Sequence, residues 1–104
     1  MSFVTTSFVT VEPETLAAAA GNLDAIGSSM AAGGMSAAAP TTAVVPPAAD
    51  EVSALTAAQF TAHAIMCQAA LAQAAAIHEL FVSTLRASAG SYAITEAANA
   101  ALTN

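Results

Sequence analysis

The sequence is short of tryptophan, cysteine and positive charge, and each shortage excludes a class of structure or function. It has no tryptophan, and Cys67 is its only cysteine, so no disulfide can form within the chain. Arg86 is the only cation beside seven carboxylates, which gives a formal net charge of −6. Because nucleic-acid binding needs a basic surface, we expect no nucleic-acid partner.

Alanine is what the sequence has in abundance. Hydrophobic residues make up 57 % of the 104 residues, and most of them are alanine. Alanine is the best helix former because it loses no side-chain entropy, but burying so small a side chain contributes little hydrophobic free energy. The composition therefore predicts one small all-α domain that is poor in core material.

The first helix is predicted over residues 13–38, after a flexible arm at residues 1–12. Pro13 suits the first helical position, and Glu14 places a negative charge near the positive end of the helix dipole. The helix is expected to loosen at Gly33-Gly34 and to end before Pro40. Its seam toward a second helix is predicted from the spacing of these residues: Leu16, Ala19, Leu23, Ile26 and Met30.

A proline-rich turn at residues 39–48 and a second helix at residues 49–88 complete the predicted fold. Pro40, Pro46 and Pro47 disfavour a helix through the turn. Asp50 and Glu51 supply negative charge to the start of the second helix, which nothing interrupts before Gly90. The pattern predicts an antiparallel two-helix hairpin.

The second helix carries a wider apolar face than one neighbouring helix can cover. At 100° per residue, an arc of roughly 200° is apolar, whereas a single packing contact needs about 100°. The arc comprises Val52, Leu55, Phe60, Met66, Cys67, Leu71, Ile77, Leu80, Phe81, Val82, Leu85 and Tyr92. A solvent-facing stripe is predicted opposite it, at Asp50, Thr61, Gln68, Glu79 and Arg86. An uncovered apolar face indicates a protein partner, or self-association of two hairpins into a four-helix bundle.

The residues that carry chemistry do not combine into an active site. We expect neither His63 nor His78 to have a cysteine or carboxylate at the spacing of metal ligands, apart from Glu79 beside His78. Cys67 on an apolar helix face is interpreted as inert packing, although a nucleophile pair with either histidine is an alternative. We therefore expect no catalytic residue, metal or cofactor.

No membrane segment or general secretory signal is expected either. Residues 52–77 carry no formal charge, but Gln59, His63, Gln68 and Gln73 interrupt them, and alanine is weakly hydrophobic. The first six residues lack the positive charge of a signal peptide.

Several motifs resemble the N-terminal domain of the mycobacterial PE family. They are Pro13-Glu14, residues 40–42 (PTT) with 44–53 (VVPPAADEVS), residues 75–82 (AAIHELFV), and Ser91-Tyr92-Ala93 with Glu96-Ala97-Ala98-Asn99. The resemblance covers roughly residues 7–104.

The resemblance implies a function through partners. PE domains are helical hairpins that complete a four-helix bundle with a PPE-family protein, and the pair is exported by a type VII secretion system. Tyr92 and Glu96, in the segment 90–98 before a tail at 99–104, match the family's Tyr-x-x-x-Asp/Glu secretion motif. A chaperone contact would be indirect, through the PPE partner. After assembly in the cytosol, the chain is expected to be secreted or associated with the cell envelope.

The expected partner interface combines both helices. Its residues are Leu16, Leu23, Ile26, Met30, Val52, Leu55, Phe60, Met66, Leu71, Ile77, Phe81 and Leu85. The alternative is a homo-oligomeric helical-bundle substrate of type VII secretion that has no PPE partner. Such proteins typically carry a Trp-x-Gly turn, and this chain has no tryptophan.

Overall fold

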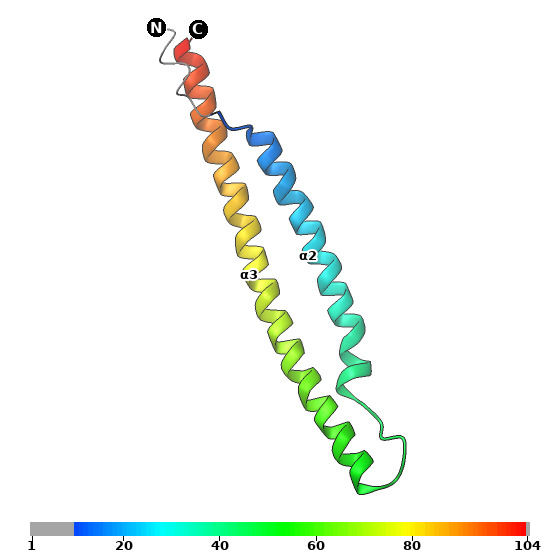
Figure 1. Ribbon diagram of the computed structural model, residues 1–104. Coiled ribbons are helices and arrows are strands. Elements are labelled where there is room, and N and C mark those ends of the chain that lie inside the picture. The colour runs from blue at the N-terminus through cyan, green and yellow to red at the C-terminus, as the bar shows by residue number, and fades with distance from the viewer. Residues whose placement is uncertain (1–9, 104) are drawn as a thin grey trace. The chain divides into compact units, whose positions relative to one another are not determined.

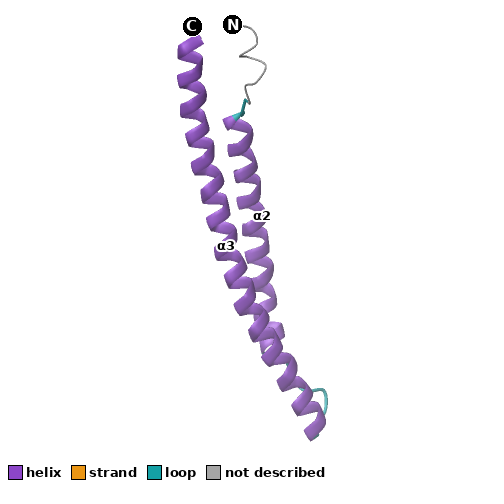
Figure 2. Cartoon of the chain, turned by 60° about the vertical axis from the view of Figure 1, so that its left-hand side comes forward, coloured by secondary structure: helices purple, strands orange, loops and turns teal. Residues whose placement is uncertain are grey.

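The computed structural model describes residues 10–103 and forms two helices, α2 (Pro13–Thr42) and α3 (Glu51–Thr103) (Figure 1). Within this range every regular element is helical (Figure 2), which confirms the predicted all-α class. The helices contribute to two compact units. One contains residues 24–80, and the other contains the described residues 10–23 and 81–103.

Helix α2 begins at Pro13, as the sequence predicts, and Glu12 caps it. The backbone N–H groups of Thr15 and Leu16 donate to the Glu12 carbonyl oxygen at 3.1 and 3.2 Å. The Thr15 hydroxyl donates to the Glu12 carboxylate at 3.0 Å. The cap satisfies donors that the first helical turn leaves without partners. Residues 1–9 of the predicted arm lie outside the described residues.

Helix α2 ends at Thr42, four residues later than predicted, and passes through Gly33, Gly34 and Pro40. The proline removes only one backbone donor, in the last turn, where few hydrogen bonds remain to be lost. The hydroxyls of Thr41 and Thr42 add side-chain hydrogen bonds there, donating to the carbonyls of Ala37 and Ala38 at 2.6 Å each. The connector is therefore residues 43–50, in place of the predicted 39–48.

Asp50 caps α3, which begins at Glu51. The backbone N–H of Ser53 donates to Asp50 Oδ1 at 2.8 Å, and the Ser53 hydroxyl donates to Oδ2 at 3.0 Å. These two hydrogen bonds, the backbone one first, lower the pKa of Asp50. Because the folded pKa is depressed, the cap stabilises the helix above the unfolded pKa and is lost as the pH falls through the folded value.

Helix α3 continues to Thr103, well beyond the predicted end at residue 88. It passes through Gly90, which has a negative φ like every other described glycine. A single glycine costs a helix only about 1 kcal/mol relative to alanine, and the surrounding residues are good helix formers. The predicted segment 90–98 and residues 99–103 of the predicted tail are therefore helical, while Asn104 is not described.

In the unit of residues 24–80, α2 and α3 pack antiparallel at glycines. A Cβ atom added to Gly27 would lie 2.7 Å from His78 Cδ2, and one added to Gly34 would lie 3.7 Å from Leu71 Cδ1. The second contact thus lies seven residues later on α2 and seven residues earlier on α3, as antiparallel helices require. The side-chain amide of Gln68 donates to the Gly34 carbonyl at 3.0 Å, which also joins the two helices. These contacts confirm the antiparallel pairing within this unit.

The seam of α2 agrees with the prediction at Leu16 and Leu23, which are partly buried, and elsewhere differs from it by one helical position. Ala20 is completely buried and Gly27 partly buried, whereas Ala19, Ile26 and Met30 are exposed. Small residues allow the helix backbones to approach closely, so glycine and alanine occupy the contact in place of the larger apolar side chains.

The solvent-facing stripe predicted for α3 is partly wrong. Thr61 and Gln68 are partly buried, and Gln68 bonds to α2, as described above. The seam instead follows Ala57 and Ala64, which are buried. A helical wheel judged by residue size and polarity predicts that the large apolar residues face the other helix. In the structure, small residues make the contact between α2 and α3.

The contact between Gly27 and His78 leads to a first prediction. Gly27→Ala must displace the imidazole of His78, whereas Gly33→Ala places its methyl group in open space. Gly33→Ala should stabilise the helix by up to about 1 kcal/mol. Gly27→Ala should be less stable than Gly33→Ala by about 1–3 kcal/mol because the contact is overpacked. A denaturant titration followed by helical circular dichroism under matched conditions ranks the variants, and this ranking does not require a cooperative transition.

The control is a double variant. In a His78→Ala background, Gly27→Ala should behave like Gly33→Ala, because the obstructing ring is gone. If Gly27→Ala and Gly33→Ala have equal effects in the original background, the close approach at Gly27 is wrong.

Candidate interaction surface

The buried interior of the described chain is small. Its buried hydrophobic residues are four alanines and one valine: Ala20, Ala57, Ala64, Val82 and Ala89. Alanine removes little apolar area from water, at roughly 25 cal/mol per Å². The contacts within the two units therefore supply little hydrophobic stabilisation.

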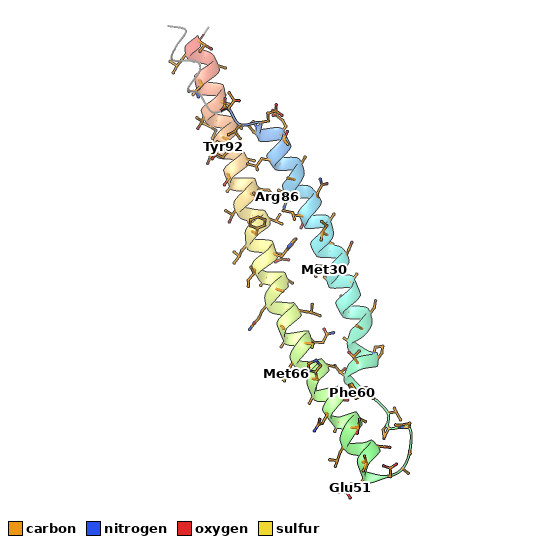
Figure 3. The ribbon with its side chains drawn as sticks, in the orientation of Figure 1. Met30, Glu51, Phe60, Met66, Arg86 and Tyr92 are labelled. Atoms are coloured by element: carbon orange, nitrogen blue, oxygen red, sulfur yellow. The ribbon has the colours of Figure 1, made fainter. Side chains whose placement is uncertain are left out.

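The large apolar side chains lie mostly on the outside. Among the described residues, sixteen large hydrophobics are exposed. Eight of them belong to α3 within residues 24–80. We call these eight residues the outer apolar face: Val52, Leu55, Phe60, Ile65, Met66, Leu71, Ile77 and Leu80. Phe60 is 64 % exposed and Met66 is 70 % exposed. Figure 3 labels both on α3, together with Met30 on α2. So much exposed apolar surface is typical of an interaction site.

The twelve residues of the predicted interface divide into two groups. Leu16, Leu23 and Leu85 are partly buried and belong to the unit of residues 10–23 and 81–103. The other nine are exposed: Ile26, Met30, Val52, Leu55, Phe60, Met66, Leu71, Ile77 and Phe81. The exposed nine are available to a partner, while the three leucines already have part of their surface covered within the chain.

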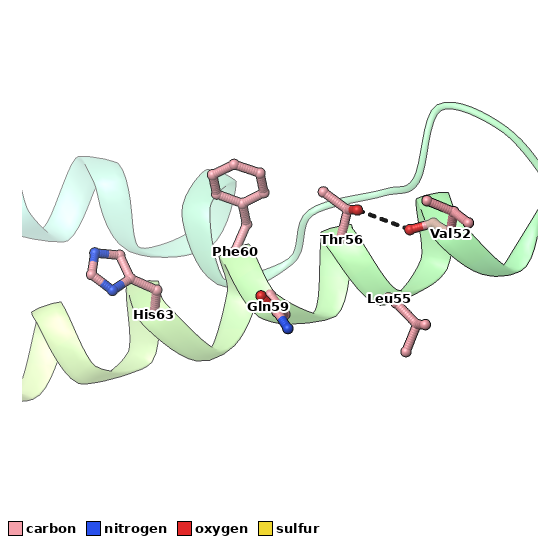
Figure 4. A pocket seen from close by; sticks show the side chains of 6 residues that line it. All are labelled: Val52, Leu55, Thr56, Gln59, Phe60 and His63. Carbon is pink, nitrogen blue, oxygen red and sulfur yellow. Dashed lines mark hydrogen bonds between the residues drawn. The ribbon is translucent and has the colours of Figure 1, made fainter.

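One end of the outer apolar face contains a hollow of about 600 Å³, lined by Val52, Leu55, Thr56, Gln59, Phe60 and His63. Figure 4 shows Phe60 and His63 projecting from the same side of α3. The Thr56 hydroxyl donates back to the Val52 carbonyl at 2.9 Å, so this polar group is satisfied within its own helix. The hollow could accept an apolar side chain of a partner.

A second hollow, of about 340 Å³, lies between α2 and α3 within the unit of residues 24–80. Its walls are mainly alanine and glycine, with larger side chains from Met30, Met35, Leu71, Gln68 and His78. Sequence reasoning missed Met35 and the role of Gly27. The seven-residue spacing of Gly27 and Gly34 was the signal that could have indicated a close approach of the helices.

His63 and Cys67 form a pair that the sequence suggested only as an alternative nucleophile pair. Cys67 Sγ lies 3.5 Å from His63 Nε2, one helical turn away, and the thiol is exposed. The expectation that neither histidine has a cysteine at ligand spacing is therefore wrong, because these residues are four apart on α3. Within the described residues no group of three or more His, Cys, Asp or Glu side chains could hold a metal ion.

Tyr92 and Glu96 lie four residues apart on α3, in the unit of residues 10–23 and 81–103. Tyr92 is 44 % exposed (Figure 3), and Glu96 is partly buried. A separation of four residues in a helix places both side chains on one face. The pair therefore lies on one turn of α3, where the sequence predicted a separate segment after the helix.

A family model described as the PE family matches residues 9–99. The chain belongs to the PE family. It is 65 % identical over 95 residues to the PE family protein PE13 of Mycobacterium tuberculosis, covering 91 % of this chain and 96 % of that protein.

Two other similar proteins, also from Mycobacterium tuberculosis, are longer. The PE-PGRS family protein PE_PGRS11 is 60 % identical over 90 residues, which cover 86 % of this chain and 15 % of that protein. The PE family protein PE8 is 53 % identical over 93 residues, which cover 89 % of this chain and 34 % of that protein. This chain thus matches PE13 over almost its whole length, and only a small part of the other two.

Proposed function

We propose that this PE family chain is a non-enzymatic subunit that forms a heterodimer with a PPE-family protein. The observation that carries the proposal is the inverted distribution of side chains, with alanines inside the helix pair and large apolar residues outside. A second pair of helices laid on the outer apolar face would bury these residues in a four-helix bundle.

The charge distribution supports a partner at this face. Between Glu51 and Glu79, α3 carries no formal charge, although the whole chain has a net charge of −6. Charged residues are depleted from the cores of protein interfaces because their desolvation is costly. The uncharged stretch therefore suits a dry contact better than it suits solvent.

The proposal includes export by a type VII secretion system, with Tyr92 and Glu96 as the recognition pair. Its support is the match to the family motif and the placement of both residues on one helical turn. The chain would assemble with its partner in the cytosol and act at the cell envelope or outside the cell. By length and composition α3 also qualifies as a membrane-spanning helix, so the absence of a transmembrane span stays a prediction.

Affinity purification of the tagged chain from its own organism tests the heterodimer. We expect a PPE-family protein to co-purify in a 1:1 ratio, retained at a salt concentration that disrupts weak ionic contacts. Recovery of the chain only as a homo-oligomer would contradict the proposal and favour the homo-oligomeric alternative.

A further inference from the structure

We propose that His63 and Cys67 form half of a zinc site, which a second copy of this chain completes. The pair lies one turn apart on α3, with Cys67 Sγ 3.5 Å from His63 Nε2. A tetrahedral zinc ion bonded at about 2.3 Å to sulfur and about 2.0–2.1 Å to nitrogen holds those two donors about 3.5 Å apart. The pair thus already has the donor separation that zinc requires.

The donor types fit zinc better than other common ions. Thiolate and imidazole suit zinc, whereas magnesium and calcium prefer oxygen ligands. Binding requires the Cys67 thiol to release its proton to solvent and the His63 imidazole to be neutral. Both side chains are accessible, since the thiol is exposed and His63 lines the open hollow beside Phe60.

One chain cannot complete the coordination from its described residues, because they provide no third His, Cys, Asp or Glu at the pair. A structural zinc ion takes four ligands, and two identical pairs would supply a Cys₂His₂ set. The two copies would meet along a stretch of α3 that carries no formal charge, so their net negative charges lie away from the contact. Phe60 and Met66, both exposed, would be buried beside the metal.

The site is local to one helical turn, so it requires only that α3 be helical and does not rest on the proposed heterodimer. A PPE partner on the outer apolar face would compete with the zinc-linked pair. The two forms can therefore be separated by testing the isolated full-length chain.

Cobalt titration of the reduced full-length chain provides the test, because tetrahedral thiolate-bound cobalt has characteristic absorption bands. We expect these bands to saturate at one metal per two chains and to disappear when zinc is added. Sedimentation should show a zinc-dependent dimer that a chelator reverses. His63→Ala and Cys67→Ala should lose the bands and the dimer, while His78→Ala, the matched histidine control, keeps both.

A second measurement uses the unaltered chain and avoids any effect of substitution on folding. Zinc should slow alkylation of Cys67, and magnesium should not. Equal alkylation rates with and without zinc, or cobalt bands that persist in Cys67→Ala, would overturn the zinc site. A metal ratio of 1:1 without dimerisation would overturn the sharing of the site between two copies.

Discussion

Tyr92→Ala is expected to stop export of the chain, whereas Ile94→Ala should leave export unchanged. Tyr92 and Glu96 share one face of α3, and Ile94 is exposed on the same helix between them. Removing the phenol or the carboxylate eliminates a recognition group without disturbing the buried alanines. The measurement is the ratio of chain in the culture medium and cell envelope to chain in the cytosol.

Glu96→Ala should reproduce the Tyr92→Ala defect, and in both variants the PPE protein should still co-purify. This combination separates an export signal from a folding defect. Normal export of the Tyr92→Ala, Glu96→Ala double variant would refute the role of the pair.

Phe60→Asp is expected to weaken partner binding at least about tenfold, because a buried phenylalanine contributes about 1.5–3 kcal/mol and the new carboxylate must be desolvated. Phe60 projects from the outer apolar face beside a hollow that could accept a partner's side chain. Titration of the chain with the proposed PPE-family partner, followed by calorimetry or fluorescence, measures the change.

Ser83→Asp is the matched control for Phe60→Asp. It introduces the same charge on α3 at an exposed position outside the outer apolar face, within one turn of the charged residues Glu79 and Arg86. The affinity of this variant for the partner should stay within a factor of about two of the affinity of the unaltered chain. If both substitutions weaken partner binding equally, then the interface lies elsewhere or the added charge alone causes the loss of affinity.

The sequence predicted the helices well because alanine content, Pro13 and Asp50 are local signals. Helix initiation depends on residues within one turn, and both starts lie within two residues of their predicted positions. The ends were less predictable. The helices pass through Pro40 and Gly90 because one missing donor or one glycine costs too little to end a long alanine-rich helix.

The packing seam was predicted less well than the helices. Hydrophobic periodicity ranks Ile26 and Met30 above Gly27, but the structure places Gly27 against His78. A pattern of large apolar residues indicates a helix face that is buried against a neighbouring element. It does not indicate whether that element is the chain's own second helix or another protein. Here nine residues of the predicted interface are exposed, and the chain's own contact uses glycine and alanine.

We expect this helix pair to fold stably only with a partner, and thermal unfolding in the presence of a chelator measures that dependence. In the metal-free state the chain alone should be helical but molten and should lack a cooperative transition, because its interior is nearly all alanine. Co-expressed with the proposed PPE-family partner, it should unfold in a single sharp transition. A metal-free chain that is monomeric and unfolds cooperatively by itself would contradict this expectation.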